Sequence, residues 1–280
     1  MNIFIRKHMI PYLSEYTQMF IVLFGAKVVV CDDTYNFQQF LEHKNNLNLF
    51  YKTFPPHIEN AIPQILQHNI KIYLVNIDQL GWRNLNTVKK ALSNKIKVID
   101  YSSENISLTK DINHVHIPLL LYNDIIIRDN LEIKYDIGFS GGDFPRRSTI
   151  LKQLSNKYNV ININKFGKKR DILTKQCRIV LNIHAFDSLS TTETLRCYPL
   201  IYNKILTVSE NTPLIESSTY GTEINKFIVF VDYDKIVSKC EEILSNYDQY
   251  YNSVFKDFDE TKIKHMVDNH IETINQNIFN

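Results

Sequence analysis

Short runs of β-branched and aromatic residues alternate with segments of helical pattern along almost the whole chain of 280 residues. The runs include MNIFIR, KVVVCDD, LNLFYKTF, IKIYLVNID and KIKVIDYS. Helical patterns lie between them, for example at residues 11–23, residues 58–68 and NTVKKALSN. This alternation predicts an α/β fold, with an open, mostly parallel sheet covered by helices on both faces.

The alternation breaks at HVHIPLLLYND, which contains a proline and leads into a second series of strands and helices. We therefore place a linker at about residues 117–131. The predicted organisation is an N-terminal Rossmann-like domain (1–125), a C-terminal Rossmann-like domain (126–250) and C-terminal helices (251–280) that pack back on the first domain. Ligands of parallel sheets bind at the carboxyl ends of the strands, so the site is expected in a cleft between the domains.

Composition excludes several classes of protein. A formal net charge of +2 is too small to indicate nucleic-acid binding by itself. The four cysteines (Cys31, Cys177, Cys197 and Cys240) form no CxxC pair, so a zinc site or a disulfide framework is not expected. The apolar stretch MFIVLFGAKVVVC is too short to span a bilayer and lacks a signal-peptide cleavage pattern, which predicts a cytoplasmic protein.

The segment DIGFSGGDFPRR is the first candidate site. A predicted strand ends in the turn Ser140, Gly141 and Gly142, where glycines let backbone N–H groups approach an anion at a helix N-terminus. Arg146 and Arg147 follow in the first helical turn, where basic residues oppose the helix dipole. A phosphate would explain them, because a guanidinium binds it with two donors. The alternative is a plain strand-to-helix turn with solvated arginines.

The segment RIVLNIHAFDSLSTTETLRCYPLI is the second candidate. Near the carboxyl end of its strand it carries three polar residues: Asn182, His184 and Asp187. A helix then opens near Thr192, with Glu193 in its first turn. Glu193 is either a favourable first-turn charge or a carboxylate that accepts both hydroxyls of a ribose. Arg196 lies on the same helix face and either pairs with Glu193 or reaches a phosphate.

These motifs occur in a familiar order. D-I-G-F-x-G with R-R, then G-K-K-R-D-I-L, I-V-L-N-I-H and E-T-L-R with L-T-V-S-E resemble the donor domain of spore-maturation-type (CgeB-like) glycosyltransferases and their bacterial and giant-virus relatives. The match covers residues 136–244 and is most specific over residues 178–210; the first half shares only the rhythm of strands and helices. The resemblance implies two Rossmann-like domains facing across a cleft (the GT-B architecture). It also implies transfer from a nucleotide-diphosphate sugar, expected to be a UDP-sugar, with no metal or other cofactor.

The resemblance also assigns roles. Glu193 would hold the donor ribose, and Arg146 or Arg147 would face the diphosphate together with Ser140, Gly141 and Gly142. The other expected donor-site residues are Phe166 and Gly167 near the nucleobase, Arg170, Asn182 and His184 lining the cleft, and Asp187, Thr192 and Arg196 at the two loops. GT-B families often carry an acidic residue eight positions before the ribose glutamate, but this chain has Ala185 there. The identity of the sugar is therefore not specified.

Two further residue types are candidates for metal binding or for proton transfer. Asp232 and Asp234 form a D-x-D pattern, which binds a metal in the GT-A class; the competing interpretation is a helix N-cap, where Asp is preferred. Among the histidines of the first half, His8 follows the first strand and is the candidate general base if the reaction inverts configuration. The stereochemistry stays open.

Two other functions remain beside glycosyl transfer to a glycan, protein or small-molecule acceptor. A catalytically inactive nucleotide- or sugar-binding protein of the same fold would explain Ala185. A DNA-modifying sugar transferase is the other alternative, although the small net charge argues against a nucleic-acid partner.

Overall fold

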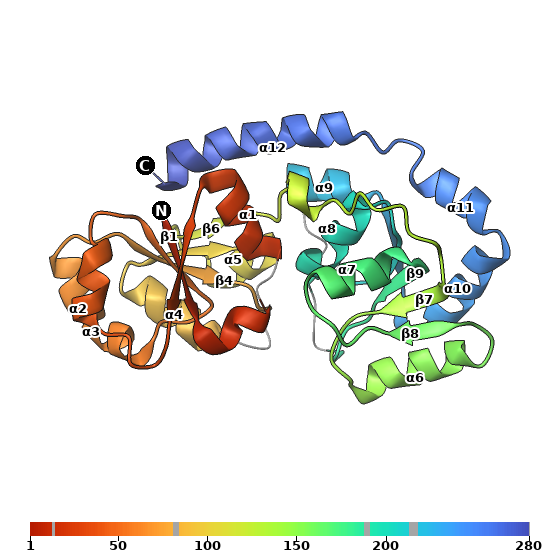
Figure 1. The fold of residues 1–280 in the computed structure, drawn as a ribbon, viewed down its shortest axis with the longest axis horizontal. Helices are drawn as coiled ribbons and strands as arrows, with labels where there is room; N and C mark the ends of the chain where they lie inside the picture. Colours follow the sequence, from red (N-terminus) through yellow and green to blue (C-terminus); the bar gives the residue numbers. More distant parts are fainter. Residues whose placement is uncertain (13–14, 81–83, 188–190, 213–217, 280) are drawn as a thin grey trace. The chain divides into compact units, whose positions relative to one another are not determined.

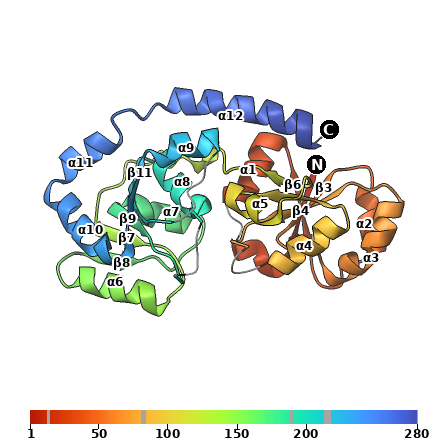
Figure 2. The ribbon, with the colours of Figure 1, turned by 180° about the vertical axis from the view of Figure 1, so that it is seen from behind.

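The chain is divided into two compact units. The computed structural model describes residues 1–12, 15–80, 84–187, 191–212 and 218–279. Unit 1 comprises Met1–Leu120 together with Asp268–Asn280, and unit 2 comprises Leu121–Val267. Figure 1 and Figure 2 show the elements of each unit from opposite sides.

Unit 1 is built on a parallel sheet of six strands in the order β2-β1-β3-β4-β5-β6. Its strands are β1 (Asn2–Arg6), β2 (Lys27–Cys31), β3 (Asn48–Tyr51), β4 (Ile72–Asn76), β5 (Lys97–Asp100) and β6 (His114–His116). Because all strand pairs are parallel, every carboxyl end lies at the same edge of this sheet.

Helices join these strands. They are η1 (Lys7–Tyr12), α1 (Glu15–Phe24), α2 (Phe37–Phe40), η2 (Leu41–His43), α3 (Pro56–Gln67), α4 (Leu85–Ser93) and α5 (Ser103–Thr109). In α3, the buried residues Ile58, Ile62 and Ile65 recur at the spacing of one helix face. They belong to one core cluster with Phe4 and Phe50 of the sheet. Burying each of these side chains contributes about 1.5–3 kcal/mol, so this face holds α3 against the sheet.

The C-terminal end of the chain packs on unit 1. It consists of α12 (Glu260–Ile274) and a π-helical turn, η5 (Asn275–Phe279). The ring of Phe279 lies 5.3 Å from that of Phe24 in α1, and Figure 1 shows the end of α12 beside α1. The carbonyl oxygen of Ile278 accepts hydrogen bonds from Tyr73 Oη at 2.9 Å and Lys97 Nζ at 3.2 Å. Unit 1 is therefore completed by residues that follow unit 2 in the sequence.

Unit 2 is built on a parallel sheet of five strands in the order β11-β10-β9-β7-β8. Its strands are β7 (Tyr135–Phe139), β8 (Val160–Asn162), β9 (Cys177–Asn182), β10 (Leu206–Glu210) and β11 (Ile228–Val231). The chain runs from β7 outward to β8 and then returns to β9 on the other side of β7. In open parallel sheets ligands bind outside the carboxyl ends at such a reversal. The fold therefore indicates the loops after β7 and β9.

The helices of unit 2 cover both faces of its sheet (Figures 1 and 2). They are η3 (Asn123–Ile125), α6 (Pro145–Ser155), α7 (Lys168–Lys175), α8 (Thr194–Tyr202), α9 (Thr219–Asn225), η4 (Tyr233–Lys235), α10 (Ile236–Ser245) and α11 (Tyr247–Val254). Consecutive residues Ile179, Val180 and Leu181 of β9 are all buried, as expected for a parallel strand covered on both sides.

The α/β fold with parallel, Rossmann-like sheets confirms the sequence prediction. Three elements were missed: β6, α5 and α9. β6 lies in HVHIPLLLYND, where the sequence pattern was interpreted as a break, because it is a three-residue strand followed directly by a proline-containing segment. α9 contains Gly221, a poor helix former, and its N-terminus is capped by Ser218 Oγ, which accepts from Gly221 N at 3.0 Å.

The predicted helix over residues 11–23 is also different. The structure has a 3-10 helix, η1, up to Tyr12, and the α-helix begins only at Glu15. Residues 13 and 14 of that prediction lie outside the described residues.

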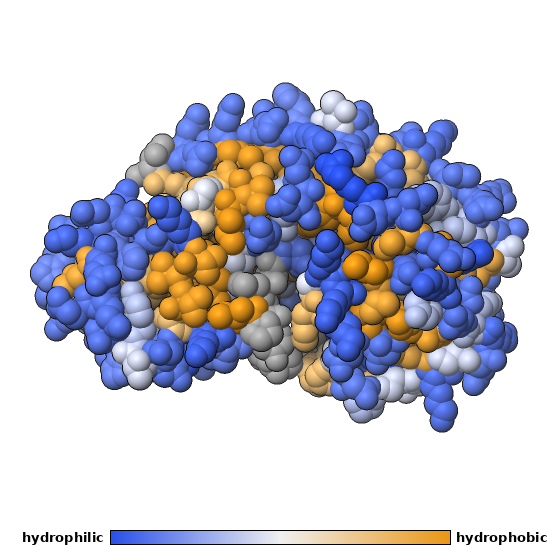
Figure 3. Space-filling view, in the orientation of Figure 1, coloured by the Kyte–Doolittle hydropathy of each residue, from blue (hydrophilic) through white to orange (hydrophobic). Residues whose placement is uncertain are grey.

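No helix in the described part of the chain is long and apolar enough to span a bilayer. Hydrophilic residues cover most of the face shown in Figure 3, with apolar residues exposed in patches in both units.

Candidate functional site

Three segments meet at the carboxyl edge of the sheet in unit 2. The first is the turn after β7 and the start of α6, the second is residues 183–187 after β9, and the third is the end of β10 at Glu210. Because β7, β9 and β10 are neighbours in a parallel sheet, these ends lie side by side. This is where the sequence placed both candidate motifs.

The glycine turn after β7 is required by packing. A Cβ atom on Gly141 would lie 2.8 Å from Cζ of Phe139 and 3.4 Å from Nη1 of Arg147. A Cβ atom on Gly142 would lie 3.1 Å from Cε2 of Phe144. α6 then begins at Pro145, and its N-cap Phe144 provides no side-chain cap. The first amides of α6 therefore keep their capacity to bind an acceptor.

Arg147 is a buried cation, with 4% of its surface exposed. Its Nε donates to the carbonyl oxygen of Ile183 at 2.7 Å, and its Nη1 donates to that of Gly142 at 3.1 Å. The guanidinium also lies 5.3 Å from the ring centroids of Phe139 and Phe144. Burial, together with nearby Arg196, lowers the pKa of Arg147 to about 10. Within the described residues its hydrogen bonds go to neutral carbonyl groups, so an anion at this position would be favourable.

Arg146 has a different environment from the one predicted. Its Nη1 and Nη2 donate to the two oxygens of Glu210 at 2.6 Å each, and its Nε donates to Asp187. Its guanidinium carbon also lies 3.7 Å from the centroid of the Tyr233 ring. The sequence predicted that Arg146 or Arg147 faces the diphosphate; in the structure Arg146 is paired with two carboxylates, because β10 ends with an acidic residue.

Glu193, Arg196 and Asn182 form a second linked group. Arg196 Nη1 donates to Glu193 Oε2 at 2.8 Å and to Asn182 Oδ1 at 2.7 Å. Asn182 is fully buried, and its Nδ2 donates to Ser209 Oγ at 3.0 Å. The bond between the two charged residues uses Oε2 of Glu193 and Nη1 of Arg196. The sequence allowed either an ion pair between Glu193 and Arg196 or contacts of both residues with a ligand. The structure is compatible with both, because the ion pair uses one oxygen of Glu193 and one nitrogen of Arg196.

Three buried polar atoms at this edge also have no partner among the described residues. They are Nε2 of His184, Oγ1 of Thr192 and Oγ1 of Thr194. The three side chains have at most 1% of their surface exposed. An unsatisfied buried polar group costs about 1–3 kcal/mol, so such groups usually have a partner. Burial also lowers the pKa of His184, which favours its neutral form.

Three predicted residues lie on the loop after β8 and the start of α7. Phe166 has 54% of its surface exposed. Gly167 is the N-cap of α7 with a φ of +56°, a conformation that favours glycine. Arg170 donates through Nε to Asp171, its neighbour, at 2.9 Å. They follow the strand next to β7, at the same edge of the sheet.

The two remaining candidates are exposed. The side chain of Asp187 has 87% of its surface exposed, although it accepts from Arg146. His8 is exposed on η1, directly after β1 in unit 1.

Asp232 occupies the N-cap position of η4 (Tyr233–Lys235), directly before α10, but its side chain makes no capping hydrogen bond. A 3-10 turn, η4, precedes the helix, so the N-cap of α10 is Lys235. Asp232 instead accepts from Lys235 Nζ at 3.1 Å and from Asn211 Nδ2 at 3.3 Å. Among the described residues no group of three or more His, Cys, Asp or Glu side chains is placed to hold a metal ion.

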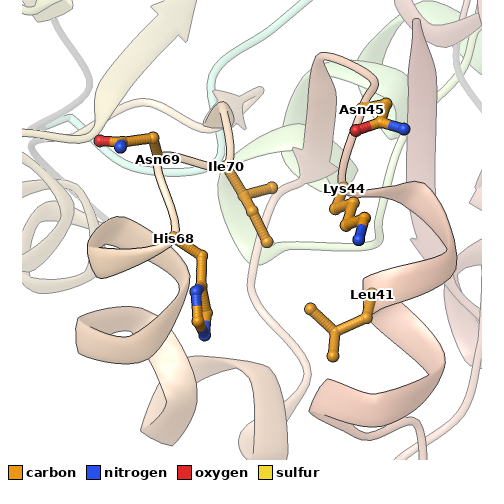
Figure 4. Close-up of a pocket in the computed structure, with 6 residues that line it drawn as sticks. All are labelled: Leu41, Lys44, Asn45, His68, Asn69 and Ile70. Atoms are coloured by element: carbon orange, nitrogen blue, oxygen red, sulfur yellow. The ribbon is translucent and has the colours of Figure 1, made fainter.

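A hollow of about 510 Å³ lies elsewhere, in unit 1 (Figure 4). It is lined by Leu41, Lys44, Asn45, His68, Asn69 and Ile70. These residues lie in η2 or follow η2 and α3, and they precede β3 and β4, so the hollow lies at the amino ends of these strands. Parallel sheets bind ligands at the opposite edge, and the hollow is therefore not the predicted site.

Sequence reasoning missed three residues at the edge of unit 2: Glu210, Tyr233 and Thr194. The available signal for Glu210 was the run LTVSE, in which a charged residue closes a buried strand. Tyr233 Oη donates to the carbonyl oxygen of Arg146 at 2.7 Å, a contact between distant segments that no local pattern announces.

No protein-family model matches the chain. It is 31% identical over 205 residues to "Uncharacterized protein L140" of Acanthamoeba polyphaga mimivirus, covering 69% of this chain and 66% of that protein. The chain is similar to mimivirus proteins. A second mimivirus relative, "Uncharacterized protein L137", is 26% identical over 276 residues, covering 92% of this chain and 36% of that protein. A third, "Uncharacterized protein L138", is 27% identical over 186 residues.

This chain spans only part of these mimivirus relatives: 66% of the first, 36% of the second and 20% of the third. Among solved structures, D-lactate dehydrogenase with NAD⁺ from Lactobacillus jensenii is 12% identical, with a TM-score of 0.25 over 90% of this chain and 97% of that one. A similarity this low carries no argument about function.

Proposed function

We propose that the chain is a glycosyltransferase that moves a sugar from a nucleotide-diphosphate sugar, expected to be a UDP-sugar, to an acceptor without a metal ion. One observation carries the proposal. His184, Thr192 and Thr194 place unpartnered buried polar atoms at the carboxyl edge of unit 2, where the buried cation Arg147 also lies. A ligand with several oxygens and a negative charge would satisfy all of these groups at once.

The diphosphate is the leaving group of such a reaction, and its negative charge grows as the bond to the sugar breaks. Arg147 and Arg196 would stabilise this charge, each in a fixed position. The hydroxyls of Thr192 and Thr194 would donate to the phosphate oxygens. His184 would do so as a neutral imidazole, because burial lowers its pKa.

Glu193 would hold the ribose. Oε2 is held by Arg196 at 2.8 Å, which orients the carboxylate and leaves Oε1 available for the ribose hydroxyls. Phe166 and Gly167, on the loop after β8, would lie on the nucleobase side.

The finer parts of the proposal concern the whole molecule. The two units would face each other as in GT-B enzymes, with the acceptor on unit 1 and His8 as the candidate base. The enzyme would act in the cytoplasm, which for a viral protein is that of the host.

Binding of UDP measured by calorimetry tests the proposal. We expect UDP to bind the full chain, and Glu193→Ala to weaken that binding about tenfold or more because the ribose contact is lost. Glu241→Ala is the matched control: Glu241 is an exposed glutamate of unit 2 paired with Lys157 at 2.6 Å. Absence of binding for every nucleoside diphosphate would refute the proposal, and unchanged affinity in Glu193→Ala would refute the ribose assignment.

A second function is favoured by one observation. Ala185 occupies the position where GT-B families often have an acidic residue, and it is buried, with 7% of its surface exposed. Such a protein would bind the nucleotide sugar without transferring it. Release of UDP from a panel of UDP-sugars, with and without acceptors or DNA, separates turnover from binding alone.

A further inference from the structure

We infer that Arg146 and Glu210 form a positioning pair that holds His184 and the loop at residues 183–187 against the diphosphate. Neither residue would contact the ligand itself. The inference rests on the proposed function, because it assigns a role within that same site.

The geometry of the pair is that of a fixed support. Two parallel hydrogen bonds of 2.6 Å join Arg146 to Glu210, and this bidentate arrangement sets both distance and orientation. Glu210 is 7% exposed and closes β10, while Arg146 lies in the first turn of α6. Tyr233 also contacts Arg146. Its ring packs on the guanidinium, and its hydroxyl donates to the carbonyl oxygen of Arg146.

The pair contacts the backbone of His184 on both sides. Glu210 Oε2 accepts from His184 N at 2.9 Å, and Arg146 Nη1 approaches His184 O at 3.4 Å. The buried Nε2 of His184 has no hydrogen-bond partner among the described residues. The position of its imidazole, and of the unpartnered Nε2, therefore depends on Arg146 and Glu210.

Charge balance separates Arg146 from Arg147. Arg146 lies between two carboxylates, Glu210 and Asp187, so it presents no net positive charge to a phosphate. Its bonds to Glu210 raise its pKa even though burial alone would lower it. Arg147 is bound to neutral carbonyl groups and keeps its charge available. Two adjacent arginines thus have different tasks.

The first test does not depend on a ligand. The imidazole resonances of the histidines are recorded by NMR in the full chain, in Glu210→Gln and in Glu241→Gln, an exposed ion pair of the same unit. We expect Glu210→Gln to shift the His184 resonance, because the backbone of His184 loses its acceptor, while the resonance of His57 in unit 1 is unchanged. Glu241→Gln should move neither. An unaltered His184 resonance in Glu210→Gln would overturn the inference.

The second test measures affinity for UDP and for uridine. Glu210→Gln and Arg146→Lys should each lower the affinity for UDP about tenfold and leave the affinity for uridine unchanged, because the pair acts at the diphosphate. The double variant should be no weaker than either single variant, since both break the same support. If Glu210→Gln raises the affinity for UDP, the released Arg146 contacts UDP directly and the inference is wrong. If that variant lowers only the unfolding midpoint, the pair is merely structural and the inference is again wrong.

The two tests distinguish failure of the proposed function from failure of the inference about Arg146 and Glu210. A wild-type chain that binds no nucleoside diphosphate refutes the proposed function, whereas the NMR result judges the positioning of His184 by itself.

Discussion

Both units are built on a parallel sheet, but the polar groups at the carboxyl edges of the two sheets differ in how they are hydrogen-bonded. In unit 1 the centre of that edge is Asp100, which is fully buried and accepts four hydrogen bonds. Its Oδ1 accepts from Ser102 N at 3.0 Å and Asn105 Nδ2 at 2.9 Å. Its Oδ2 accepts from Asn76 Nδ2 at 2.7 Å and His114 Nε2 at 3.0 Å. The ends of β4 and β5 are therefore bound to each other through this carboxylate.

The corresponding edge of unit 2 leaves several groups unsatisfied. His184, Thr192 and Thr194 have no partner for their buried polar atoms among the described residues, and Arg147 has no carboxylate. In the described part of unit 1 the unpartnered buried atoms are Nε of Arg6 at the end of β1, Oγ1 of Thr17 in α1 and Oη of Tyr35 after β2, and none lies at the ends of β4 and β5. The ends of β4 and β5 in unit 1 thus have their polar groups paired with one another, whereas the end of β9 and the start of α8 in unit 2 leave buried polar atoms unpaired among the described residues.

The largest expected effect comes from Asp100→Ala. It leaves His114 and three N–H donors unpaired, so we expect unit 1 to lose about 3–5 kcal/mol of stability. Hydrogen–deuterium exchange should increase in β4 and β5, while the affinity of the folded protein for UDP stays unchanged.

Glu59→Ala is the control for Asp100→Ala. Glu59 pairs with Lys90 at 2.7 Å on the surface of unit 1, and losing an exposed pair changes stability by at most about 1 kcal/mol. If Asp100→Ala weakened UDP binding without loss of protection, the contrast between the two edges would be reversed.

A smaller effect is expected from Thr192→Val and Thr194→Val, which keep the side-chain shape. Removing an unpartnered buried hydroxyl should raise the free energy of unfolding by about 1 kcal/mol in each variant. Affinity for UDP should fall about fivefold, since each hydroxyl is assigned to a phosphate oxygen. Denaturant unfolding and calorimetry measure the two quantities.

Thr207→Val is the matched control for these variants. Thr207 is fully buried, but its hydroxyl donates to Ile205 O at 3.0 Å. This variant should therefore lose stability and keep its affinity for UDP. The same loss of stability in all three threonine variants would show that the hydroxyls of unit 2 are satisfied in solution.

The smallest effect concerns pH. The folded protein lowers the pKa of His184 below its unfolded value of 6.5, so the unfolded state binds more protons below that pH. Stability is complete above pH 6.5 and falls as the pH decreases, by at most about 1.4 kcal/mol per pH unit. His184→Gln should flatten this dependence in unfolding curves recorded from pH 5 to 8. An identical dependence in both proteins would mean that His184 is solvated.

The sequence predicted most of the strands and helices and less of the site. Buried runs such as RIVLN are readable because a covered parallel strand is continuously apolar. The same logic fails for β6, which is too short to carry a pattern. At the site, local spacing paired Arg196 with Glu193, three residues apart, and the structure shows that bond.

The role of Arg146 could not be predicted in this way. Its partner Glu210 is distant in sequence, and only the neighbouring positions of β7, β9 and β10 bring the two together. Long-range contacts of this kind follow from topology, and the motif alone favoured a phosphate ligand for both arginines.

The closing segment of unit 1 has a consequence for biosynthesis. Tyr73 and Lys97 bond to the carbonyl of Ile278, and Phe24 packs on Phe279, so these contacts cannot form until the chain beyond unit 2 has left the ribosome. Unit 2 is continuous in sequence and can complete its sheet earlier. The half of the chain made first is therefore the last to be finished, and a nascent chain arrested after Val267 would carry all residues of unit 2 but an unfinished unit 1.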